Sequence, residues 1–334
     1  MSRKKLKLTG AIIAGVTSLL LLVIAGWLLL NRQYVADQIS VWSYEPSASV
    51  QKISDRIELT NKGEFYFYTT HPVVAPSADF NQDCPRQEPG SPILGCYSAG
   101  RIYIYDITNE QLDGIEEVTA AHEMLHAAWE RMSEGEQSKL ATLLRAEYQK
   151  HANDSLTQRM EYYERNQPGE FENELHSILA TEVGSLSPEL EEYYTQYFED
   201  RQKIVTLHAS YEIVFVSLAE QADVLYKELV ELGNSIKERT TQYNTDVSNL
   251  SLSISSFNAR ADSGDFSSIA QFNQERAELV ARSNEIEANR IAISADIETY
   301  NSKNAQYESI ANQIDALNKS IDSIRDLQET PTVQ

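Results

Sequence analysis

Apolar residues near the start of the chain form one uninterrupted run. From about Leu8 to Leu30 there are 23 residues without a single charge. A helix rises about 1.5 Å per residue, so this run is long enough to cross a hydrocarbon core of about 30 Å. The pattern predicts a transmembrane helix over 8–30, with a short basic tail before it at 1–7.

The charges beside this run predict its orientation. Several basic residues precede it in the tail, whereas only Arg32 follows closely. Because basic residues are retained on the cytoplasmic side, we expect the N-terminus in the cytoplasm and everything after Asn31 outside, in a single-pass cell-membrane protein. The alternative is a cleaved signal peptide, which would release the same domain in soluble form. The run is long for such a peptide, and no small-x-small cleavage site follows it.

Strand and helix patterns both occur in the next segment, 31–205, which predicts an α+β domain. Two short runs rich in aromatic and β-branched residues, 64–70 and 101–106, are typical of strands. Ser187 and Pro188 supply an N-cap and a first-turn proline for one helix. The other expected helices of this segment cover 112–132, 134–151, 155–166 and 171–184.

Beyond about Tyr211 apolar residues recur every seven positions, and glycine and proline almost disappear. The heptads fall into two blocks separated by a breaker at 261–266. Two long helices joined by a short turn predict an antiparallel coiled-coil hairpin over 206–328, followed by a disordered tail at 329–334. A set of shorter bundled helices is the alternative. The expected seam includes Leu225, Leu229, Leu232, Ile236, Tyr243, Val247, Leu250, Ile254 and Phe257, then Leu279, Ile286, Ile293, Ile297, Tyr300, Tyr307, Ile314, Ile321 and Ile324.

Charge narrows the range of partners. The chain has 28 Lys and Arg against 50 Asp and Glu, which gives a net charge of −22. Such a surface repels phosphate backbones, so nucleic acid is not an expected partner. It is typical of a solvated extracellular protein that does not lie flat on anionic lipid. The coiled coil is instead expected to bind a protein partner or to self-associate.

The two cysteines fit an oxidising compartment. Cys84 and Cys96 bracket a loop rich in proline and glycine. A disulfide that closes a loop of this size contributes ~3 kcal/mol in the chain-entropy model. The alternatives are two free thiols or a second metal site, but the nearest histidine, His71, lies in another segment. We therefore expect Cys84 and Cys96 to be bonded.

The candidate chemistry is concentrated in one stretch, 119–128. It places His122, Glu123 and His126 in an otherwise uncharged sequence. Helix positions four apart lie on the same face, so two imidazoles at this spacing can bind one zinc ion. Glu123 can then reach a water on that metal and act as general base. The alternative is an amphipathic helix with two core histidines, but burying these groups without partners is costly.

A catalytic zinc ion usually has three protein ligands, so a third must come from downstream. Here the sequence resembles a known family. The stretch 119–128 matches the extended helix signature of zinc peptidases. The motif Asn173-Glu174-x-x-Ser177 is similar to the second-helix motif of gluzincins, the thermolysin-like metallopeptidases. In that family the glutamate is the third ligand, so the resemblance implies Glu174.

The match departs from the family at two points. The family's aspartate is replaced by Ile178, which removes the usual carboxylate partner of the first histidine. The gap from His126 to Glu174 is also long. Two other ligands are therefore candidates: Glu182, two turns along the same helix face, and His176, about 200° around the helix from Glu174.

The resemblance implies an extracytoplasmic zinc metallopeptidase, a hydrolase of peptide or protein substrates anchored by its N-terminal helix. Tyr162, Tyr163 and His176 are candidate donors to the transition-state oxyanion. The strand at 101–106 is expected to align an extended peptide at the edge of the sheet. The alternative function is a coiled-coil scaffold or adhesion protein whose zinc-peptidase-like domain is catalytically silent. A third option is zinc-dependent hydrolysis of an amide in cell-wall material.

Overall fold

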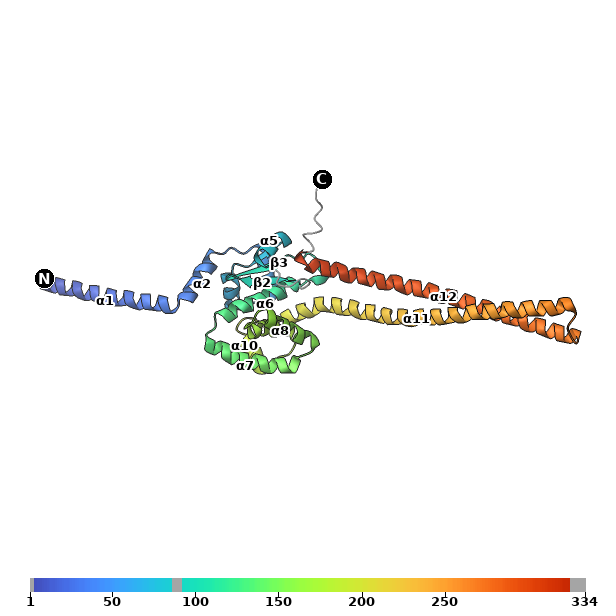
Figure 1. Ribbon diagram of the computed structural model, residues 1–334. Helices are drawn as coiled ribbons and strands as arrows, with labels where there is room; N and C mark the ends of the chain where they lie inside the picture. Colours follow the sequence, from blue (N-terminus) through green and yellow to red (C-terminus); the bar gives the residue numbers. More distant parts are fainter. Residues whose placement is uncertain (1–2, 86–91, 325–334) are drawn as a thin grey trace, which may run out of the picture. The chain divides into compact units, whose positions relative to one another are not determined.

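The computed structural model describes residues 3–85 and 92–324, with side chains from Ile12 onward. The described part is mostly helical and contains a small three-stranded sheet (Figure 1). One compact unit comprises Met1–Val214 and Leu317–Gln334, and the other comprises Phe215–Ala316. The mixture of helices with a short sheet agrees with the predicted fold class at this level. The tail predicted at 329–334 lies outside the described residues.

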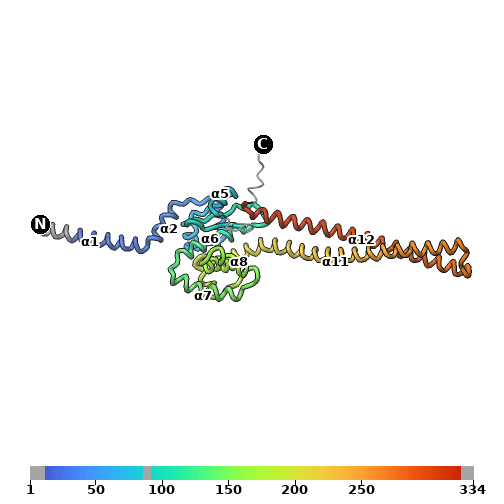
Figure 2. Tube along the Cα trace, in the orientation of Figure 1, coloured from blue at the N-terminus to red at the C-terminus, as the bar shows by residue number. Residues whose placement is uncertain are grey.

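Helix α1 (Arg3–Leu30) contains the predicted membrane segment. Its stretch Ile12–Leu30 is long and apolar enough to cross a bilayer and is not buried against the rest of the chain. A signal sequence near an N-terminus has the same properties. The single residue Asn31 separates α1 from α2 (Arg32–Ser43), and α3 (Ala48–Ile57) follows. The trace in Figure 2 shows α2 following α1 along the chain.

Helix α4 (Asn61–Thr69) replaces the strand predicted at 64–70, so that prediction is wrong. Thr60 caps the helix, because its hydroxyl accepts a hydrogen bond from the N–H of Gly63 at 3.2 Å. Gly63 and Phe67, four positions apart, are both buried. Burial therefore follows the helical period and not the alternation of a strand.

The sheet has the order β1–β3–β2. Its central strand, β3 (Arg101–Tyr105), runs parallel to β1 (Val73–Ala75) and antiparallel to β2 (Gly95–Ser98). The strand predicted at 101–106 is thus confirmed. The expectation that it forms the edge of the sheet is wrong, because β3 lies between β1 and β2, which are the two edge strands.

Helix α5 (Ser77–Asp83) ends at a disulfide that fastens the edge strand. Cys84 is bonded to Cys96 of β2, with their Cα atoms 5.9 Å apart, as the sequence predicts. Cys84 is buried in a small cluster with Phe80 and Tyr105. The bond therefore joins the end of α5 to β2.

The main core surrounds α6 (Ile115–Glu130). Several small or apolar residues of this helix have no exposed surface, including Ala120, Ala121, Met124 and Leu125. Small side chains allow the neighbouring elements to approach the helix closely. The helices that follow agree with the predicted ones and are α7 (Glu134–His151), α8 (Asp154–Asn166), α9 (Phe171–Glu182) and α10 (Pro188–Tyr194).

The second unit is formed by the greater part of two long antiparallel helices, α11 (Arg201–Ser263) and α12 (Ile269–Ile321). The rings of Phe257 and Phe272, beside the turn, are 5.0 Å apart. Tyr226 of α11 and Tyr307 of α12, far from the turn, have ring centroids 6.4 Å apart. This arrangement agrees with the predicted hairpin, although α11 begins at Arg201 rather than at 206.

The seam of the hairpin is more polar than predicted. Its buried members include Leu229, Leu250, Phe257 and Ile293, as expected. Other predicted members are exposed, namely Val247, Ile254 and Ile297. In the middle of the hairpin the second row lies one position before these three residues and is polar there, at Asp246, Ser253 and Asp296. Arg239 there forms an ion pair with Asp296, and Lys303 forms one with Glu228.

Both long helices are rooted in the first unit. On α11, Leu207 packs against Gly114, where an added Cβ would lie 3.0 Å from the Cβ of Leu207. Just beyond α12, the Ser323 hydroxyl donates to Oδ1 of Asn81 at 2.8 Å, and Nδ2 of Asn81 donates to the Ser323 carbonyl at 3.0 Å. The chain therefore leaves this unit through α11 and returns to it through α12.

Candidate metal centre

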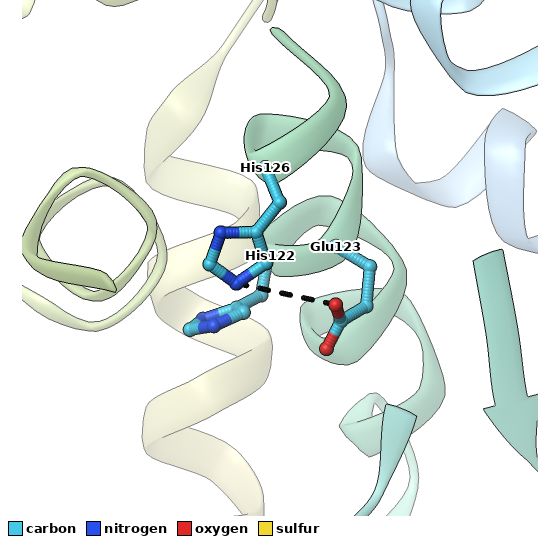
Figure 3. A group of neighbouring side chains, drawn as sticks. All are labelled: His122, Glu123 and His126. Atoms are coloured by element: carbon cyan, nitrogen blue, oxygen red, sulfur yellow. Dashed lines mark ion pairs between the residues drawn. The ribbon is translucent and has the colours of Figure 1, made fainter. Parts of the chain in front are cut away.

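Helix α6 brings three potential metal ligands together. The rings of His122 and His126, one turn apart, have centroids 4.8 Å apart and an interplanar angle of 79°. The ligand atoms of these histidines and of Glu123 all lie within 4.8 Å of one another. Figure 3 shows the carboxylate beside both rings, with Oε2 of Glu123 at 4.0 Å from Nε2 of His126. The predicted spacing therefore produces one compact cluster.

Glu174 of α9 joins this cluster. Its Oε2 lies 3.5 Å from Nε2 of His122 and 3.8 Å from Nε2 of His126. Ligand atoms about 2.1 Å from a tetrahedral zinc ion are about 3.4 Å from one another, so both spacings fit such a site. Glu174 is only 6% exposed, and its Oε2 has no hydrogen-bond partner among the described residues. A cation held jointly with the imidazoles would satisfy this otherwise costly buried oxygen.

Glu123 and Glu174 fit different roles. Oε2 of Glu123 is 4.0 Å from Nε2 of His126, whereas Oε2 of Glu174 is nearer to both imidazoles. Glu123 also follows His122 directly, so it lies about 100° around the helix from it. The geometry thus favours Glu174 as the third ligand and leaves Glu123 beside the centre as a base.

Asn173 fixes the protonation of His126. Nδ1 of His126 lies 3.0 Å from Oδ1 of Asn173, and Nδ2 of Asn173 donates to a carboxylate oxygen of Glu170 at 2.7 Å. Since that carboxylate can only accept, the amide oxygen must face His126 and accept from Nδ1. Nε2 of His126 then carries its lone pair toward Glu174, as a metal ligand must.

Comparison with known proteins does not indicate a function for this cluster of residues. The sequence matches no protein-family model, no curated protein and no solved structure. The function must therefore be inferred from the geometry and electrostatics of the centre.

Burial and the neighbouring histidines shift the pKa values of the two carboxylates of the centre in opposite directions. Burial raises the pKa of Glu123, although the neighbouring His126 and His122 partly oppose this. Burial also acts to raise the pKa of Glu174, but His122 and His126 outweigh it and hold that pKa below the ordinary value. Glu123 is thus the more basic carboxylate, whereas Glu174 remains an anion suited to a cation.

Glu182, the second candidate ligand, is engaged elsewhere. Its Oε2 accepts a hydrogen bond from Nη2 of Arg159 at 2.6 Å and lies 3.7 Å from Nε2 of His208. The Arg159 guanidinium and His208 therefore compete with any metal for this carboxylate. Glu182 belongs to an ion-pair cluster between α8, α9 and α11, and it is a poorer ligand than Glu174.

His176, the third candidate, packs in an aromatic core between α6, α9 and α10. It is completely buried, stacked on Tyr194 at 5.5 Å and packed against Trp129 at 5.7 Å. Burial lowers its pKa to about 3, so the ring is neutral. It fits an aromatic core, which agrees with its predicted position around the helix from Glu174. The same packing makes it a poor oxyanion donor.

Two features of the centre were not recognised in the sequence. One is the Asn173–His126 hydrogen bond, although Asn173 belongs to the motif that carries the family resemblance. The other is Gly95 of β2, where a Cβ would lie 2.5 Å from Cγ2 of Thr119 and 3.1 Å from Cγ of Glu123. Only a glycine lets this strand approach the face of α6 that carries Glu123 so closely. Strand β2 was not predicted, so the sequence offered no signal for this contact.

Proposed function

We propose that the protein is a membrane-anchored, extracytoplasmic zinc metallopeptidase of gluzincin type. The observation that carries the proposal is the buried Oε2 of Glu174, which has no hydrogen bond among the described residues and lies 3.5 and 3.8 Å from the two histidine Nε2 atoms. His122, His126 and Glu174 would hold the ion. An ordinary core histidine pair would not require a buried carboxylate without a hydrogen bond at this point.

The residues around the centre have distinct roles. When bound, zinc supplies Lewis acidity, lowering the pKa of a coordinated water and polarising a carbonyl oxygen. Glu123 takes the proton from the attacking water and delivers it to the leaving amine, a role that suits its raised pKa. Asn173 holds His126 in the tautomer that can bind the ion.

Strand β2 supports a peptide as the substrate. In its antiparallel ladder with β3, Leu94 accepts a hydrogen bond from the Tyr105 N–H at 2.8 Å, and Cys96 pairs with Tyr103. Backbone groups alternate along a strand, so those of Gly95 point away from β3. An extended peptide could add to this edge beside Glu123, which replaces the role first expected of 101–106.

Tyr163 is the best candidate to stabilise the oxyanion. Burial raises its pKa, and the charges of Glu174 and Glu123 act in the same direction. A tyrosine with a raised pKa stays protonated and can donate a hydrogen bond. The same reasoning does not extend to His176, which is enclosed by aromatic rings.

Location and partners complete the proposal. Helix α1 anchors the protein in the cell membrane, with the basic N-terminus in the cytoplasm. The hairpin of α11 and α12 binds a protein partner or a second copy and does not take part in the chemistry.

The test combines metal analysis with peptide cleavage. The full chain, purified in detergent, should bind one zinc ion and cleave members of a peptide library, and a chelator should abolish cleavage. Glu123→Gln should keep the zinc but lose about 10²–10⁴-fold in rate. Glu134→Gln, an exposed substitution on α7, is the matched control. Bound zinc without any Glu123-dependent cleavage would contradict the peptidase and favour the catalytically silent scaffold.

A further inference from the structure

Helix α2 has an exposed apolar face. Tyr34 is 53% exposed, Ile39 is 58% exposed and Trp42 is 78% exposed. At about 100° per residue these side chains fall within an arc of about 140°. Ser40 lies about 170° from the middle of that arc. The ring of Tyr34 also lies 5.7 Å from that of Phe65, but all three side chains keep more than half of their surface exposed and form a patch that a partner could cover.

The opposite face of α2 is fixed to the domain by hydrogen bonds. The Ser40 hydroxyl donates to the Thr69 carbonyl at 2.8 Å. Asp37 is buried and accepts hydrogen bonds from Nε and Nη2 of Arg131, at 2.9 and 2.8 Å. Arg131 directly follows α6, the helix that carries the candidate metal ligands. The exposed side of α2 is therefore held in a fixed orientation by polar contacts on its inner side.

The charge of this segment differs from that of the whole chain. The protein has 50 acidic residues, yet Asp37 is the only one before Glu45. Its carboxylate is buried under Arg131. The outer face of α2 therefore presents no negative charge, which removes the repulsion from lipid headgroups that the remaining acidic surface would experience.

The position of α2 in the chain indicates what covers the face. Only Asn31 separates its first residue from Leu30, the last residue of the candidate membrane span. Consecutive Cα atoms are about 3.8 Å apart, so Arg32 must lie within about 8 Å of the end of that span. A helix that begins there with exposed Tyr and Trp side chains has the features of an interfacial helix.

We infer that the outer face of α2 lies on the bilayer surface, with Tyr34, Ile39 and Trp42 in the headgroup region. The inference rests on α1 remaining in the membrane. Through Asp37 and Arg131, the docked α2 holds the C-terminal end of α6 close to the lipid surface. On the proposed function, this placement favours substrates at the same membrane surface, such as segments of membrane proteins next to their own spans.

The three tryptophans of the chain, Trp27, Trp42 and Trp129, allow a direct test. The full chain is reconstituted in phosphatidylcholine vesicles whose acyl chains carry bromine near the headgroups, which quenches adjacent tryptophans. Trp27→Phe retains Trp42 and Trp129. Its emission should fall roughly twofold relative to unbrominated vesicles, because one of the two indoles lies in the interface. The double variant Trp27→Phe/Trp42→Phe retains only Trp129 of the domain and should show no quenching.

Three other results would each overturn the inference. Equal emission of Trp27→Phe in brominated and plain vesicles would overturn it. Protection of Trp42 from iodide without quenching by bromine would also overturn it, since a protein surface would then cover the face. Trp42→Phe, which retains Trp27, must be quenched, because otherwise α1 is not in the bilayer and the inference fails with it. None of these readings depends on zinc or on cleavage, so they are independent of the proposed activity.

Discussion

Asn173 accepts a hydrogen bond from Nδ1 of His126 at 3.0 Å, across the interface between α9 and α6. This bond sets the tautomer of one candidate metal ligand and is itself oriented by Glu170. Asn173→Ala should therefore weaken zinc binding about 10–100-fold. Competition with a fluorescent zinc chelator measures this, with Asn234→Ala on an exposed part of α11 as the control. Unchanged affinity in Asn173→Ala would show that His126 does not depend on this hydrogen bond.

The two candidate ligands of α9, Glu174 and Glu182, should differ in their effect on zinc affinity in the same assay. Glu174→Gln removes the oxygen that lies between the two imidazoles, so its loss of zinc affinity should exceed that of Asn173→Ala. Glu182→Gln removes a charged partner of Arg159 and His208 and should retain zinc. The opposite ranking would identify Glu182 as the ligand. Both variants change one oxygen to an amide on the same helix, so they control for each other.

The buried pair of Asp37 and Arg131 should contribute strongly to the stability of the domain. Arg131→Met leaves the Asp37 carboxylate buried without its cation, which should lower the free energy of unfolding by about 3–5 kcal/mol. Urea unfolding in detergent, followed by circular dichroism, measures this change. Arg290→Met, which breaks an exposed pair with Glu287, should have little effect. Equal effects of the two substitutions would argue against the buried pair.

Acid should destabilise the junction of α9, α10 and α11 through Glu191. Burial acts to raise its pKa, but hydrogen bonding to Arg201 outweighs this and lowers the pKa below the ordinary 4.5. The folded state thus binds this proton less tightly than the unfolded chain. The resulting stability is present above about pH 4.5 and is lost as the pH falls through the folded pKa. Melting temperatures between pH 3 and 6 should fall less steeply in Glu191→Gln than in the wild type, and parallel curves would exclude Glu191 as a contributor.

Reduction should loosen the edge strand. The bond between Cys84 and Cys96 closes a short loop, so replacing both residues with serine should cost about 3 kcal/mol. Because β2 packs against Glu123 through Gly95, peptide cleavage should decline along with thermal stability. Thermal unfolding and cleavage, each measured with and without dithiothreitol, test the two effects. The double serine variant, which has no disulfide left, should be insensitive to the reductant.

The elements with strong local signals were predictable. The helix at Glu134–His151 has a capping box from Ser133 to Glu136, and its bounds were predicted to the residue. The strand predicted at 64–70 was wrong because a short aromatic run fits the period of a strand and that of a helix equally well. Gly63 is buried against the carbonyl of Tyr197, and this contact favours the helix. Tyr197 is distant in sequence, so no local pattern could contain this contact.

The centre was predictable to a similar degree. The positions of His122, Glu123 and His126 follow from helical spacing alone. The choice between Glu174 and Glu182 depends on Arg159 and His208, which reach the same cluster from α8 and α11. Likewise, the seam of the hairpin lies one position earlier than predicted at this point, so Val247 is exposed and Asp246 is half-buried. Such one-residue shifts depend on the pairing of the two helices and not on either sequence alone.

The return of the chain through α12 makes the hairpin removable. Tyr226 and Tyr307 have ring centroids 6.4 Å apart, so a short glycine-serine linker could join their backbones and omit the 80 residues between them. The contacts of Leu207 with Gly114 and of Ser323 with Asn81 would both be kept. The length of this arm can therefore change without altering the cluster of His122, Glu123 and His126, and the shortened protein would separate the properties of the hairpin from those of the candidate metal centre.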